Sequence, residues 1–170
     1  MVLQGLKKHQ MMLDFVVHLV KRIFPMNMEA RHQIIDFSVQ TEYNFSMFLS
    51  GYLGIDRDSS RSLSNRSTKL SFNQQLNLIL DMNILNKEEV KKLESFAQIR
   101  NKFAHVVEIK TYNQCLSSDS TLKNSIDKLY PISIPIDDEI DSTYQVVKLL
   151  SDIVIIGDKI INKLKIKVET

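Results

Sequence analysis

An arginine and a histidine stand five residues apart in the segment 99–105, whose sequence is IRNKFAH. The guanidinium of Arg100 stays charged in a protein and can hold two oxygens of an anion at once. The imidazole of His105 changes its charge near neutral pH, so it can take up or release a proton. These two side chains are the first candidates for chemistry in this chain.

Arg100 occupies an unusual position on the helix that the sequence predicts around it. At about 100° per residue, the residues from 90 to 107 place an apolar stripe on one side of the helix, and Arg100 falls in its middle. An arginine that faces a core needs a carboxylate or another acceptor, or it must reach a cleft. Glu42 lies on the apolar side of the helix predicted over 28–53, so we predict a structural ion pair between Glu42 and Arg100. His105 lies about 140° round from Arg100, so the two do not share a face within one chain.

The elements that must position these residues are all predicted to be helices. The chain has only four glycines and three prolines, and its apolar residues recur three or four apart over long stretches. Pairs of capping residues mark two helix starts, Ser71 with Gln74 and Asn86 with Glu89. We predict an all-α single-domain bundle of about five to six helices over residues 1–170, the helices covering 3–24, 28–53, 71–83, 87–108, 120–129 and 137–165.

The composition sets further bounds on the class of protein. At 170 residues and 44% hydrophobic content the chain can bury a core. A formal net charge of +2 is far from the basic balance of proteins that coat nucleic acid. A single cysteine, Cys115, excludes an internal disulfide and favours the cytoplasm, and no segment is typical of a membrane span. Residues 56–68, rich in serine and arginine, are predicted to form an exposed, mobile loop.

The remaining histidines and acids do not form a recognisable metal site. His9, His18 and His32 form no pair at the spacing that zinc sites use on a helix. The acids between residues 29 and 42 make no Glu-x-x-His pair, which argues against a di-iron bundle. We therefore predict neither a metal nor another cofactor.

The pattern of Arg100-Asn101 followed by His105 resembles the signature of the HEPN superfamily, all-helical domains in which such an arginine and histidine are separated by four to six residues. The text around it, LESFAQIRNKFAH over residues 93–105, looks more narrowly like the branch that contains the mannitol operon repressor family. Ser71-Phe72 and the turn MNIL at 82–85 also stand where that branch has them. The resemblance covers about residues 27–110 and implies a HEPN-like helical bundle.

The resemblance implies a metal-independent endoribonuclease of the toxin or defence type. In such enzymes the 2'-hydroxyl of RNA attacks the adjacent phosphate, which requires a proton acceptor or donor and a cation near the developing charge. His105 would move the proton, Arg100 would stabilise the charge, and Asn101 would orient the phosphate or the imidazole. Lys102 is the expected substrate-binding residue. Since one chain does not bring Arg100 and His105 together, a two-fold homodimer belongs to this hypothesis.

A non-catalytic role remains the alternative, either a HEPN-fold regulator or a protein-interaction module of the mannitol operon repressor type. Arg100 would then serve only as an ion-pair partner, and the imidazole of His105 would bind free carbonyls at the end of its helix. The toxin branch often has tyrosine two residues beyond the histidine, where this chain has Val107. The expected partner in this case is an antitoxin or a regulatory protein, and no membrane is involved.

Overall fold

The computed structural model describes residues 29–64 and 69–168, and this part of the chain forms six helices and no strand. The predicted all-α fold class is therefore confirmed. The helix predicted over 3–24, with His9 and His18, lies outside the described residues. The six helices are α2 (Ala30–Leu53), α3 (Phe72–Asp81), α4 (Lys87–His105), α5 (Tyr112–Ser117), α6 (Ser120–Leu129) and α7 (Asp138–Val168).

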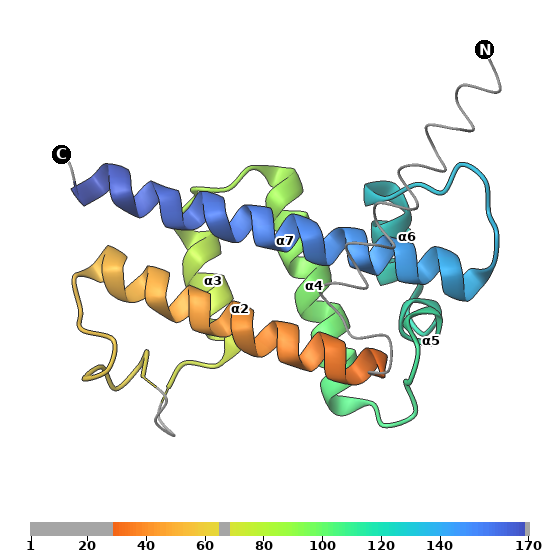
Figure 1. Ribbon diagram of the computed structural model, residues 1–170, viewed down its shortest axis with the longest axis horizontal. Helices are drawn as coiled ribbons and strands as arrows, with labels where there is room; N and C mark the ends of the chain where they lie inside the picture. The colour runs from red at the N-terminus through yellow and green to blue at the C-terminus, as the bar shows by residue number, and fades with distance from the viewer. Residues whose placement is uncertain (1–28, 65–68, 169–170) are drawn as a thin grey trace, which may run out of the picture.

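The two longest helices, α2 and α7, run side by side in the same direction along the long axis of the molecule (Figure 1). Helix α4 crosses behind both of them and contacts both, while α3 packs against α2 and α4. The short helices α5 and α6 gather near the first half of α7. Helix α4, which carries the arginine and the histidine, is thus the central element of the bundle.

Local capping residues define several helix ends where the sequence predicted them. Ser71 and Gln74 form a complete capping box at the start of α3, and Asn86 and Glu89 form another at the start of α4. Gly54 ends α2 with a φ of +66°, a left-handed conformation that glycine adopts without the steric cost of a Cβ. Each of these signals satisfies backbone groups that a helix end leaves unpaired.

Two predictions about connecting segments need correction. Helix α5 was not predicted, although Thr111 and Gln114 form a third capping box at its start. The segment from residue 56 was predicted to be exposed, yet Leu63 is only 3% exposed and belongs to the core. Arg57 is also packed, because its Nε donates to Ser46 Oγ at 2.9 Å and its guanidinium lies 4.6 Å from the ring centroid of Tyr43.

An aromatic cluster forms the centre of the core between α2, α3 and α4. The ring of Phe96 meets the rings of Phe37 and Phe72 edge to face, at centroid distances of 5.4 and 5.7 Å. Phe72 also stacks on Phe45 at 5.8 Å. Such contacts add to the stability that burial of large rings supplies. The cluster fixes the face of α4 from which Arg100 projects.

Candidate functional site

Arg100 lies at the border between the core and the exposed side of α4. Its side chain is half-buried, and its guanidinium carbon is 5.7 Å from the centroid of the Phe72 ring. Nη1 donates a hydrogen bond of 3.1 Å to Oδ1 of Asn101, the next residue toward the exposed side. The Nε atom is buried and has no hydrogen-bond partner within the described chain. The aromatic ring and the amide together hold the guanidinium plane in one orientation.

The predicted ion pair between Glu42 and Arg100 is wrong. The carboxylate of Glu42 binds Lys69 instead, with Oε1 at 2.7 Å from Nζ. No carboxylate lies within ion-pair distance of Arg100 in residues 29–64 and 69–162. The physical reason is that the ring of Phe72 occupies the position against the guanidinium, while the segment before α3 brings Lys69 to Glu42.

His105 is the last residue of α4 and is exposed. Arg31 from α2 binds one carbonyl of the last turn of α4 and three carbonyls of the segment that follows it. The Arg31 guanidinium donates to the carbonyl of Phe103 and, through Nη2, to those of Val106, Val107 and Ile109 at 2.8, 3.2 and 3.0 Å. Within the described chain, the imidazole of His105 makes no hydrogen bond to the carbonyls at the end of its helix.

Arg31 was not identified from the sequence, although a signal for it exists. It stands in the first turn of α2, where a positive charge opposes the helix dipole. An arginine in such a place suggests acceptors outside its own helix. The carbonyls at the end of α4 are those acceptors, so Arg31 fixes the direction in which the chain leaves the His105 position.

Lys102, expected to bind substrate, lies in an ion pair inside the chain. Its Nζ is 3.4 Å from Oδ2 of Asp119, and the two side chains are 21% and 34% exposed. A hydrogen bond from the backbone N–H of Leu122 lowers the pKa of Asp119, and Lys102 lowers it further. Asp119 thereby stays ionised and competes with any phosphate for Lys102.

The exposed side of α4 separates Arg100 from His105. Asn101 is half-buried and Ala104 is exposed, and both lie between the two charged residues on the helix circumference. One chain alone therefore does not direct the guanidinium and the imidazole at a common point. A small residue such as Ala104 leaves room for another molecule to approach the helix backbone between them.

Comparison with known proteins found no relative of this chain: no family model, no curated protein and no solved structure matches it. Within residues 29–64 and 69–162, no group of three or more His, Cys, Asp or Glu side chains is placed to hold a metal ion. None of the described helices is long and apolar enough to cross a membrane.

Proposed function

We propose that this protein is a metal-independent endoribonuclease of the HEPN type, which cuts RNA as a two-fold dimer with Arg100, Asn101 and His105. One observation carries the proposal: Arg100 pairs with no carboxylate in the described chain, and its Nη1 is held by Asn101 at the edge of the exposed side of α4. A guanidinium that no acid neutralises keeps its charge for an anion such as a phosphate.

The proposed reaction requires no external nucleophile. The 2'-hydroxyl attacks the adjacent phosphorus, and the bond to the 5'-oxygen of the next nucleotide breaks. His105 is exposed and can exchange a proton with one of these two oxygens. Arg100 stabilises the charge that grows on the phosphorane. Because the two side chains diverge on one helix, Arg100 of one protomer and His105 of its partner supply the two roles in each site.

The test is cleavage of a defined RNA in EDTA by purified protein. Cleavage is expected to leave a 2',3'-cyclic phosphate, because attack by the 2'-hydroxyl closes that ring. His105→Ala should slow the reaction by about 100-fold or more. His32→Ala is the matched control, since His32 is an exposed histidine on α2. Arg100→Lys should also slow cleavage, because lysine keeps the charge but loses the planar fork.

Full activity in a folded His105→Ala variant would contradict the proposal, as would products that end in a linear 3'-phosphate from the first moments of the reaction. An effect of His32→Ala as large as that of His105→Ala would point to a nonspecific loss of structure. Circular dichroism of each variant separates loss of fold from loss of chemistry.

One observation favours the second candidate, a non-catalytic regulator or interaction module. Val106 and Val107 follow the motif directly and are 38% and 74% exposed. Apolar side chains this exposed beside a motif suit a protein interface, whether with a second copy or with an antitoxin or regulatory protein. A protein that dimerises through this surface yet leaves RNA intact would favour the second candidate.

A further inference from the structure

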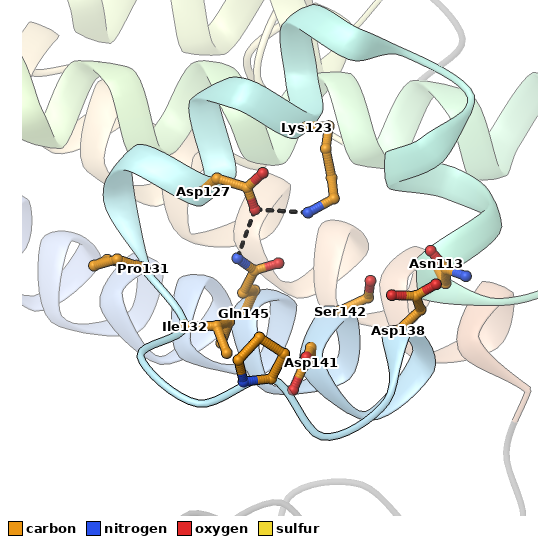
Figure 2. Close-up of a pocket in the computed structure, with 10 residues that line it drawn as sticks. Asn113, Lys123, Asp127, Pro131, Ile132, Asp138, Asp141, Ser142 and Gln145 are labelled. Atoms are coloured by element: carbon orange, nitrogen blue, oxygen red, sulfur yellow. Dashed lines mark hydrogen bonds and ion pairs between the residues drawn. The ribbon is translucent and has the colours of Figure 1, made fainter.

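A cavity of about 400 Å³ lies between α6, the loop that follows it and the first turns of α7 (Figure 2). Neither Arg100 nor His105 lines it. Polar and acidic side chains from α6 and α7 line it, among them Lys123, Asp127, Asp138, Asp141, Ser142 and Gln145. Its chemistry can therefore be considered independently of the proposed RNA cleavage.

Gln145 presents an unused acceptor to this cavity. The side chain is 1% exposed, and its Nε2 donates to Asp127 Oδ1 and to the carbonyl of Tyr130, each at 2.9 Å. Because both partners are acceptors, these two hydrogen bonds identify the amide nitrogen of Gln145 and distinguish it from the amide oxygen. The Oε1 atom is buried and accepts no hydrogen bond from the described chain. In Figure 2 this oxygen points away from Asp127, into the space between Lys123 and Ser142.

The charges around this oxygen are predominantly negative. Three aspartates and one lysine line the cavity, which leaves two net negative charges. Lys123 is already engaged, because its Nζ is 2.7 Å from Asp127 Oδ1. Asp141 accepts only the weak hydrogen bond from the backbone N–H of Ile136, at 3.3 to 3.4 Å. Asp138 is exposed in the first turn of α7.

An occupant that matches these groups must be positively charged and must donate hydrogen bonds. Buried acceptors are satisfied by donors, and carboxylates bind cations. The walls also contain Pro131, Ile132 and Pro135, which offer apolar surface to a methylene chain. The described residues hold no three-ligand metal arrangement, so the donor set suits an organic cation.

We propose that this cavity binds a small aliphatic amine or guanidine, whose N–H groups donate to Gln145 Oε1 and whose charge is balanced by Asp138 and Asp141. A ligand of this kind satisfies the buried amide oxygen and neutralises the excess of carboxylates, while its chain packs on the prolines. The site connects α6 to the start of α7, so its occupation should also stabilise the fold.

Isothermal titration calorimetry with putrescine and with agmatine, at constant ionic strength, tests the proposal on the full chain. We expect saturable binding of at least one of them with one site per chain, and none of 1,4-butanediol, which has the same length but no charge. Asp138→Asn should weaken binding about tenfold or more, because it removes a charge that a cation would contact. Asp158→Asn is the matched control, since Asp158 is an exposed aspartate on the same helix outside the cavity.

Gln145→Met removes the acceptor at similar volume and should abolish binding. Since Gln145 is buried and holds Tyr130, this variant is judged only if its circular dichroism is native, and Asp138→Asn decides the matter otherwise. No binding of either amine, equal affinity in Asp138→Asn and Asp158→Asn, or tighter binding of Mg²⁺ than of both amines would overturn the proposal. The amine titration uses no RNA, so its outcome is distinguishable from that of the cleavage assay.

Discussion

The guanidinium groups of Arg31 and Arg100 both lie near the motif, but they contact different kinds of partner. Arg31 binds four carbonyls that follow or close α4, whereas Arg100 binds an amide and a ring. A charged donor on backbone carbonyls stabilises a helix terminus. Arg31 is therefore a structural residue, whereas Arg100 has no carboxylate partner in the described chain.

Replacement of Arg31 by alanine should destabilise the protein by about 2 kcal/mol, because several carbonyls lose a charged donor at a half-buried site. Arg31→Lys should recover only part of this loss, since one ammonium cannot span carbonyls from Phe103 to Ile109. Urea denaturation followed by circular dichroism measures both variants. Equal stability of Arg31→Ala and the parent chain would show that water replaces the guanidinium without cost.

Cys115 gives a pH dependence whose sign can be derived. Burial raises the pKa of its thiol from 9.0 to about 12. Above about pH 9 the unfolded chain loses the thiol proton while the folded chain keeps it, so rising pH favours unfolding. The stability that the neutral thiol contributes is complete below pH 9 and is lost progressively toward pH 12.

The expected loss from this one group is about 1 kcal/mol between pH 7.5 and pH 10. Urea midpoints at the two pH values measure it, and Cys115→Ala should show a smaller decrease between them. Because the two pH values are compared within each variant, the loss of stability caused by the cavity that alanine leaves is the same at both and cancels. A decrease in Cys115→Ala as large as that in the parent chain would assign the effect to other groups, such as Tyr112 and Tyr130, whose pKa values burial also raises.

At the scale of the element, two helix starts and one helix end were predicted from local capping residues, whereas α5 was not predicted although Thr111 and Gln114 cap it in the same way. The starts of α3 and α4 follow from side chains that cap their own helix within three residues, and the end of α2 follows from Gly54. Helix α5 has only six residues, too few for an apolar period to be visible. Its first N–H groups are bound by Glu139, 26 and 27 residues further along the chain, and no local rule reveals that contact.

The side of α4 on which Arg100 lies was also predictable, whereas its neighbours were not. Helical periodicity places Arg100 on the apolar stripe, and the structure places its guanidinium against Phe72. Glu42 was predicted as the partner because it is the acid nearest the apolar stripe of α2. The competing cation, Lys69, comes from the segment before α3, whose path depends on tertiary packing. Periodicity predicts which face of a helix a residue lies on, but it does not predict which of several cations pairs with a given carboxylate.

The anchoring of α5 leads to a prediction at this scale. Glu139 accepts the N–H groups of Tyr112 and Asn113 at 3.2 and 3.3 Å, so it joins the start of α7 to the start of α5. Glu139→Ala should destabilise α5 by about 1 kcal/mol and increase amide hydrogen exchange there about fivefold. Glu94→Ala, at an exposed glutamate of α4, is the control and should leave exchange in α5 unchanged.

At the scale of the whole molecule, the question is how a divergent arginine and histidine could form one site. An exposed strip runs from Ala104 and His105 at the end of α4 to Val106 and Val107 just beyond it. The carbonyls of these valines are held by Arg31, so the strip has a fixed shape. A two-fold contact along it would cover the valines and bring the guanidinium of one copy toward the imidazole of the other. Such a dimer should bury about 1,200 Å² or more in total.

The dimer can be tested by placing a charge on Val107, the more exposed of the two valines. Val107→Glu should convert the protein to a monomer in sedimentation velocity at tens of micromolar, since burying an unpaired carboxylate in an interface is costly. Cleavage of RNA should fall with it, although every motif residue is still present. The loss should be partly reversed at high protein concentration, because a weakened dimer re-forms by mass action.

Ile155→Glu is the matched control for this change. Ile155 is 65% exposed on α7, and the ion pairs of Lys92 with Asp152 and of Lys159 with Glu89 place that part of α7 beside the first half of α4, at the end opposite His105. The same charge there should leave both sedimentation and cleavage unchanged. A parent protein that sediments as a monomer while cutting RNA would exclude the shared site and require Arg100 and His105 to act separately. A Val107→Glu variant that stays dimeric but no longer cuts would instead place Val107 at the substrate, because the charge would then repel the phosphates of RNA without opening the interface.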